Sequence, residues 1–361
     1  MRIQRQYMQA NIEQLFFPVE EHPVQYWDSA RGQSCDIPRC KAIVDAERGT
    51  PLSVVSKDYR LVTNEAAFKM VAPIASEFFG GNGLRDFECF NVLYPKTRSF
   101  CRVDLTRRGS CEFELPGGEK YIAFIRMTNS YNRLSRLTLI IGFCRWICLN
   151  GCIFGERSFT LSVNHTDRRL CDPHFISKVV EEARREIGSL AEAKRRFADA
   201  ASILPQICLT NEQIRGIFCL VNGVSVDAAS ARSLPEKRRG YYLELNSRLD
   251  ELVASYTAEF GNNAYAAFNV LTDYASYPRS GSSDATRTPA GQSRAGRWLC
   301  DFSRLVRAPG FDIKSYIGSF DESQNVLGRL KDFPPRGDAD ASYGGTDASS
   351  RETAGSEERA F

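Results

Sequence analysis

Residues 121–166 have the sequence YIAFIRMTNSYNRLSRLTLIIGFCRWICLNGCIFGERSFTLSVNHT, and this stretch decides the fold. Residues Tyr121–Met127 are apolar and aromatic apart from one Arg, which favours a β-strand. In Leu137–Ile141, successive side chains point to opposite faces of a strand. The side chains on both faces are mostly apolar, so this strand is predicted to be central and buried on both faces. Residues Phe159–Asn164 alternate apolar and polar side chains, which predicts a third strand with one polar face. We therefore predict the centre of an antiparallel sheet.

Two turns and one ambiguous apolar run connect these strands. Thr128–Arg133 is polar and favours a turn, and Asn150-Gly151 is a turn dipeptide. The run Leu137–Phe154 has the length of a membrane span, but Arg145 lies near its middle, where a charge costs roughly 3 kcal/mol in a bilayer. A buried strand followed by a turn is therefore the favoured interpretation, and no membrane partner is expected.

The rest of the chain divides into a strand-rich and a helical half. Before residue 121, we expect strands at 42–46, 52–56, 84–94, 99–105 and 111–115, and a helix over 66–79. From Asp172, as N-cap, the period becomes 3.6 and predicts one helix to about Ala201. Thr210–Gln213 is a capping box, further helices are expected from Glu236 and over 262–274, and residues 276–296 have the composition of a loop.

These patterns predict an α+β protein, in which an antiparallel β-sheet of the N-terminal half is packed by long helices of the C-terminal half. We expect residues 1–36 to form an irregular arm. Residues 37–331 should form a single domain, with the sheet in 37–166 and the helical part in 172–300. Residues 332–361 lack an apolar pattern, which predicts a disordered acidic tail.

Charge and cysteine content limit the compartment and the partners. The N-terminus has no apolar signal core, so we expect a cytoplasmic protein whose 12 Cys are mostly reduced. Residues 332–361 hold seven acidic residues and three Arg, a net charge of −4; because the whole chain carries +3, residues 1–331 carry +7. A basic body with an acidic tail is compatible with a polyanionic partner.

The motifs of common enzymes are absent from the sequence. There is no phosphate-binding Gly-x-x-x-x-Gly-Lys loop, no dinucleotide fingerprint after a strand, and no His-Glu-x-x-His. No catalytic residue is nominated and no cofactor is expected, although enzymatic activity stays open. Two interpretations of a group of Cys and His residues remain. They are small buried hydrophobic residues in a sheet, which we favour, or they form a zinc site. The residues concerned are Cys144, Cys148, Cys152, His165, Cys171 and His174.

An ordered set of short motifs carries a family resemblance. The motifs are Gly49–Val55 with Tyr59 and Asn64, Thr128–Tyr131, Arg145–Gly151, Asn164–Thr166, Ala264–Tyr274 and Gly296–Leu299. This set resembles the phage- and plasmid-type proteins that share the domain of unknown function 932, found on prophages, plasmids and integrative elements. The resemblance implies no catalytic residues. At one turn, Asn132-Arg133 stands where the family commonly has Asp-Gly, which makes the turn more basic.

Three functions fit these observations. The strand-then-helix layout is similar to that of phage single-strand annealing proteins, so we expect single-stranded DNA binding and homo-oligomers, with the aromatic N-terminal arm as a docking element. Phosphate contacts would come from Arg133, Arg136 and Arg145, stacking from Tyr131 or Trp146, and support from Arg126 and Arg297. The alternatives are a structural or host-interaction protein without nucleic-acid binding, and a metal-dependent enzyme that uses His165, Cys171 and His174.

Overall fold

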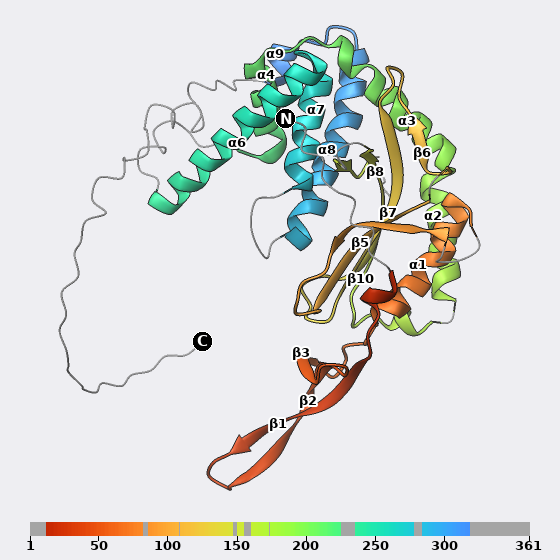
Figure 1. The fold of residues 1–361 in the computed structure, drawn as a ribbon, viewed down its shortest axis with the longest axis vertical. Helices are drawn as coiled ribbons and strands as arrows, with labels where there is room; N and C mark the ends of the chain where they lie inside the picture. Colours follow the sequence, from red (N-terminus) through yellow and green to blue (C-terminus); the bar gives the residue numbers. More distant parts are fainter. Residues whose placement is uncertain are drawn as a thin grey trace, which may run out of the picture.

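The protein has the predicted α+β architecture, with antiparallel sheets in the N-terminal half and helices in the C-terminal half (Figure 1). The computed structural model describes residues 12–81, 86–107, 109–146, 150–154, 160–172, 174–224, 235–277 and 284–317. The predicted tail at 332–361 lies outside these described residues.

The main sheet is antiparallel, with strand order β10-β8-β7-β5-β4, and it confirms the prediction made from residues 121–166. The strands β7 and β8 lie at its centre and are buried on both faces. Its strands are β4 (Glu88–Leu93), β5 (Phe100–Thr106), β6 (Glu112–Glu114), β7 (Lys120–Ser130), β8 (Leu137–Arg145), β9 (Gly151–Cys152) and β10 (Thr160–Val163). The short strands β6 and β9 pair with β7 and β8.

A second, three-stranded sheet projects from the body as an arm (Figure 1). It consists of β1 (Val19–Asp28), β2 (Gln33–Asp45) and β3 (Thr50–Ser56). Because β3 pairs only with residues 40–45 of β2, the outer parts of β1 and β2 form a two-stranded ribbon. The prediction of irregular structure is therefore wrong for residues 19–28 and 33–36. No core covers this ribbon, so its sequence lacks the apolar alternation that marks a half-buried strand.

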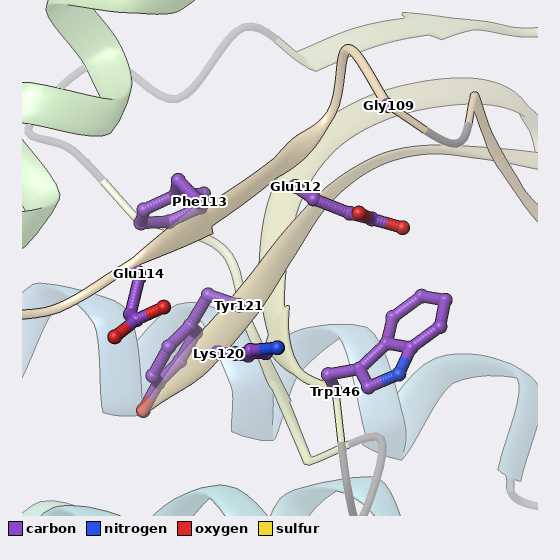
Figure 2. Close-up of a pocket in the computed structure, with 7 residues that line it drawn as sticks. All are labelled: Gly109, Glu112, Phe113, Glu114, Lys120, Tyr121 and Trp146. Carbon is purple, nitrogen blue, oxygen red and sulfur yellow. The ribbon is translucent and has the colours of Figure 1, made fainter. Parts of the chain in front are cut away.

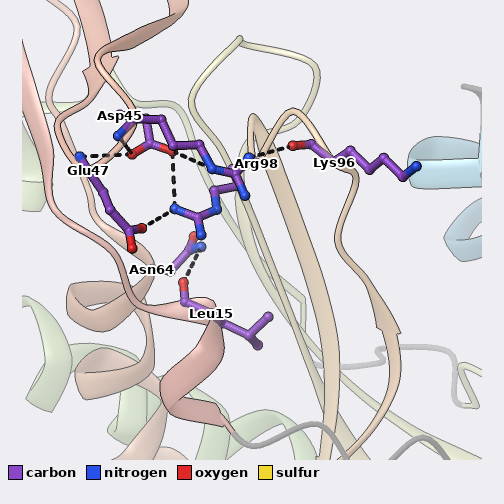
Figure 3. A network of polar contacts seen from close by, with 7 residues as sticks. Leu15, Asp45, Glu47, Asn64, Lys96 and Arg98 are labelled. Carbon is purple, nitrogen blue, oxygen red and sulfur yellow. Dashed lines mark hydrogen bonds and ion pairs between the residues drawn. The ribbon is translucent and has the colours of Figure 1, made fainter.

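Ion pairs fasten the base of the arm to the body (Figure 3). The carboxylate of Asp45 is fully buried and accepts a hydrogen bond from the Arg98 guanidinium at 3.2 Å. Arg98 also pairs with Glu47, and its guanidinium lies 4.9 Å from the ring centroid of Phe17. Arg48 donates to the carbonyl oxygen of Lys96 at 3.0 Å. These contacts hold the arm against the turn that joins β4 to β5.

The helices form two groups around the main sheet. Helices α1 to α3 lie along one side of the sheet, and α4 and α6 to α9 gather at one end of the molecule (Figure 1). Their bounds are α1 (Asn64–Phe79), α2 (Phe175–Ile187), α3 (Leu190–Ser202), α4 (Asn211–Asn222), α6 (Glu236–Phe260), α7 (Ala264–Ser276), α8 (Asp284–Arg307) and α9 (Ile313–Ile317), with 3₁₀ turns at Ile12–Leu15, Arg168–Cys171 and Leu204–Gln206. No helix among the described residues has both the length and the apolar character needed to cross a membrane.

The prediction of a single helix from Asp172 to Ala201 is wrong, because the helix is interrupted at Gly188. Gly188 has φ +71°, and Ser189 caps α3 by accepting a hydrogen bond from the backbone N–H of Glu192 at 3.1 Å. Gly188 ends α2 at a positive φ that glycine adopts readily, and the Ser that follows is a preferred residue to start the next helix. The N-cap assigned to Asp172 is also wrong, since α2 begins at Phe175.

The loop predicted at 276–296 is wrong as well, because α8 begins at Asp284. Its small residues permit close packing: a Cβ on Gly291 would lie 2.9 Å from the Cβ of Ala275, and one on Gly296 would lie 1.9 Å from the carbonyl oxygen of Ile153. A composition typical of a loop therefore belongs to a helix that is pressed against α7 and the segment after β9. The capping box at Thr210–Gln213 is confirmed.

Candidate nucleic-acid interface

The structure places Arg126 in the core instead of on a surface. Its side chain is 1% exposed and forms two 2.6 Å hydrogen bonds with the carboxylate of Asp104 on β5. It also donates to the side-chain oxygen of Gln292 on α8. Arg126 therefore links the sheet to α8, and the prediction that it supports a DNA contact does not fit this position.

Arg145 is buried in the same manner, at the opposite end of β8 from the turn that precedes it. It is 2% exposed and lies 2.6 Å from the carboxylates of both Glu119 and Glu259. Its guanidinium lies 4.6 Å from the ring centroid of Phe260. These contacts join the sheet to the end of α6. Because Arg145 is buried, the prediction that it contacts phosphate does not fit the structure.

Tyr131 also cannot offer a stacking surface, because it is fully buried. Its hydroxyl accepts a hydrogen bond from the backbone N–H of Asn64 at 2.9 Å, and its ring packs edge-on against Phe17 at 5.7 Å between centroids. Burial raises the pKa of the Tyr131 hydroxyl above its ordinary value. The residue serves to connect the arm, the start of α1 and the end of β7.

Trp146 is half-buried and lines a pocket of about 420 Å³ (Figure 2). The pocket is also lined by Gly109, Glu112, Phe113, Glu114, Lys120 and Tyr121. Two carboxylates beside one Lys make this pocket unsuited to phosphate. It lies at the far end of β8 from the turn before Leu137, and the nine residues of β8 separate the two by about 30 Å. Arg297, which is exposed on α8, follows Gly296 at the Ile153 contact and also belongs to this end.

Two of the predicted residues, Arg133 and Arg136, lie exposed in the turn between β7 and β8. Neither forms an ion pair or a hydrogen bond through its side chain with any described residue. Arg133 has φ +61°, in the left-handed region that favours glycine. The Asn132 side chain accepts a hydrogen bond from the backbone N–H of Leu134 at 3.2 Å and fixes this turn. The Arg at this position is thus held in a conformation that its own backbone disfavours.

Two further cations, which the sequence did not nominate, lie in β2 and directly after β3, near the base of the arm. The backbone N–H of Lys57 donates to the carbonyl oxygen of Arg39 at 2.9 Å, and both side chains are exposed. Two residues after Lys57, the Tyr59 hydroxyl donates to the carbonyl oxygen of Ser130 at 2.9 Å. We call Arg39, Lys57, Arg133 and Arg136 the junction cluster, because they lie where the arm meets the body.

Charges from the arm and from the β7–β8 turn both act on the Tyr59 hydroxyl. Burial raises the pKa of Tyr59, Glu21 on β1 adds to the rise, and the Arg133 guanidinium opposes it. Arg133 therefore lies within electrostatic range of the arm. No sequence signal could have grouped residues 39, 57 and 133, since tertiary contacts between the arm and the body, such as the one from Tyr59 to Ser130, bring these segments together.

The weaker metal candidates do not form a cluster. His165 is 5% exposed, its Nδ1 lies 3.2 Å from the carbonyl oxygen of Arg60, and its ring stacks on Tyr59 at 4.8 Å. Burial lowers the pKa of His165. His174 is exposed at the start of α2. Within the described part of the chain, no three His, Cys, Asp or Glu side chains are placed to hold a metal ion; Cys148 and the side chain of Cys171 lie outside that part.

One comparison with known proteins gives a match. The family model described as a domain of unknown function, DUF932, matches residues 51–297, which is well over half of the 361-residue chain. No curated protein and no solved structure matches the chain. The matched range covers the main sheet and the helices as far as the middle of α8, and it begins within β3 of the arm.

Proposed function

The chain belongs to the DUF932 family, and we propose that this member binds single-stranded DNA through the junction cluster. Arg39, Lys57, Arg133 and Arg136 would contact phosphate groups of the backbone, each releasing condensed counterions on binding. Contacts of this type carry no base information, so the proposed binding is independent of sequence.

A single observation carries the proposal: Arg133 is exposed, unpaired with described residues, and held at φ +61°. A non-glycine residue in the left-handed region costs roughly 1–2 kcal/mol. Strain of this kind concentrates at functional positions. Because Arg133 forms no ion pair with the described residues, its side chain does not offset this strain there, which supports an external anionic partner.

The first prediction concerns the salt dependence of binding. Replacing both Arg133 and Arg136 by Ala should lower the slope of log affinity against log salt concentration by roughly 1 to 1.5, because each phosphate contact on a single strand contributes about 0.7. Affinity should fall alike for all base sequences. Fluorescence anisotropy with labelled oligonucleotides of two unrelated sequences, over a salt series, measures both quantities.

The matched control removes two other exposed cations that have local partners. Lys69 pairs with Glu65 at 2.7 Å on α1, and Arg195 pairs with Asp199 at 3.1 Å on α3. The variant Lys69→Ala/Arg195→Ala changes net charge by the same amount, and its salt slope should stay close to that of the wild type. A junction variant that keeps wild-type affinity and slope would remove the turn from the binding surface.

We extend the proposal to the biological role that the sequence suggests. A chain that binds single strands without sequence preference suits a cytoplasmic strand-annealing or recombination protein of a phage or plasmid. This part of the proposal rests on the resemblance in layout to annealing proteins, whereas the binding itself rests on the junction cluster.

A further inference from the structure

The outer ribbon of the arm exposes two adjacent aromatic side chains. Tyr26 is 51% exposed and Trp27 is 65% exposed. Because consecutive residues of a strand point to opposite faces, neither face of the ribbon is covered at this point. An isolated two-stranded hairpin is only marginally stable in water, and exposed large aromatic residues are typical of binding sites. The ribbon therefore has the character of a docking element.

The charge of the ribbon indicates what it docks on. Residues 19–39 hold the four carboxylates of Glu20, Glu21, Asp28 and Asp36 against two cations, Arg31 and Arg39, a net charge of −2, and Glu21 pairs with Lys41 of β2 at 2.8 Å. Such a charge disfavours a nucleic acid and favours a protein surface that carries cations. The partner surface should also contain an aromatic or apolar group for Tyr26 and Trp27.

The N-terminal end of α6 has these properties. Lys237 and Arg238 are exposed and form no ion pair with the described residues, and Tyr241 is 52% exposed. The buried residues of α6 begin only at Leu245, and its first turns extend away from the body (Figure 1). Cations in the first turn of a helix are opposed by the helix dipole, so this arrangement is not explained by helix stability.

We propose that the ribbon of one copy of this chain docks on the N-terminal end of α6 of a second copy. Trp27, the more exposed of the two, would contact Lys237, Arg238 and Tyr241, combining cation–π contact with charge complementarity. The ribbon and the α6 end project from different sides of the molecule (Figure 1), so the contact joins two copies head to tail. Such a heterologous contact produces rings or filaments.

The test uses two variants of the full chain that each lose one half of the contact. Tyr26→Ala/Trp27→Ala removes the aromatic pair of the ribbon, and Lys237→Glu/Arg238→Glu reverses the charge of the α6 end. The wild type should show a mass above 40.6 kDa that rises with concentration in light scattering. Each variant alone should stay monomeric, with the association weakened at least about tenfold.

The mixture of the two variants gives the sharpest result. The Lys237→Glu/Arg238→Glu variant keeps its ribbon, and the Tyr26→Ala/Trp27→Ala variant keeps its α6 end. One intact contact can therefore form between the two variants, so an equimolar mixture should form a dimer and no larger assembly. A monomeric wild type, a mixture that stays monomeric, or an α6 variant that still assembles would each overturn the proposal. The variant Leu305→Ala, altered at another exposed apolar residue, should assemble as the wild type does. These masses are measured without nucleic acid, so they are independent of the DNA-binding test.

Discussion

At the scale of single residues, substitutions of Arg133 should change the stability of the fold and the binding of DNA independently. Replacing it by Gly removes the penalty of the left-handed backbone, while Gly also loses more chain entropy on folding, so Arg133→Gly should be about 0–1 kcal/mol more stable than the wild type. Arg133→Ala keeps the penalty and should leave stability almost unchanged. Both variants should bind single-stranded DNA equally weakly. Urea unfolding and anisotropy measure the two effects.

The outcome that contradicts this interpretation is a loss of stability in Arg133→Gly, which would show that the Arg side chain supports the fold. The contrast with Arg126 explains why the sequence was ambiguous at this scale. Both are Arg residues near the same strand, yet Arg126 faces the buried carboxylate of Asp104, 22 positions earlier. Residue type and strand position do not reveal such a partner, so the sequence could nominate both residues but could not separate the core cation from the surface one.

At the scale of elements, apolar periodicity predicted what the core covers. Strands β7 and β8 have strong apolar patterns because both of their faces are buried. Helix α1 has a strong apolar pattern because one stripe along it is buried. The ribbon of β1 and β2 and the first half of α8 carry no such pattern. The ribbon is uncovered, and α8 packs through Gly291 and Gly296, whose missing side chains leave no apolar signal. A close approach that depends on the lack of a Cβ atom cannot be predicted from the hydrophobicity of the sequence.

Gly296 and Gly240 form a matched pair that tests this account of α8. Both lie inside helices, where Gly→Ala ordinarily stabilises by roughly 0.5–1 kcal/mol. A Cβ at Gly240 meets nothing within 4 Å, so Gly240→Ala should show that gain. A Cβ at Gly296 would lie 1.9 Å from the Ile153 carbonyl oxygen, so Gly296→Ala should instead destabilise by about 1–3 kcal/mol. Equal gains in thermal or urea unfolding would mean that α8 does not pack closely on this segment.

At the scale of the whole molecule, the chain separates opposite charges. The ribbon is acidic, and the junction cluster and the α6 end are basic. Each surface proposed here therefore has a distinct partner: phosphate for the junction cluster and a second copy for the ribbon. The sequence alone predicted the basic body and acidic tail, because net charge needs no structure. It could not predict that the segments carrying these four cations lie at the base of the arm.

Residues 332–361 supply the last prediction, since their net charge of −4 is tethered to a basic body. A linked acidic segment acts at a high effective concentration and should compete with DNA for the same cations. Ending the chain at residue 331 should therefore tighten binding to single-stranded DNA at low salt, and the gain should vanish near 1 M salt, where the Debye length is about 3 Å. A full-length chain whose seven tail carboxylates are changed to amides should show the same gain, which separates charge from length. If the shortened chain binds more tightly but the amide variant does not, the tail acts by bulk. If neither changes affinity, the tail does not reach the junction cluster at all.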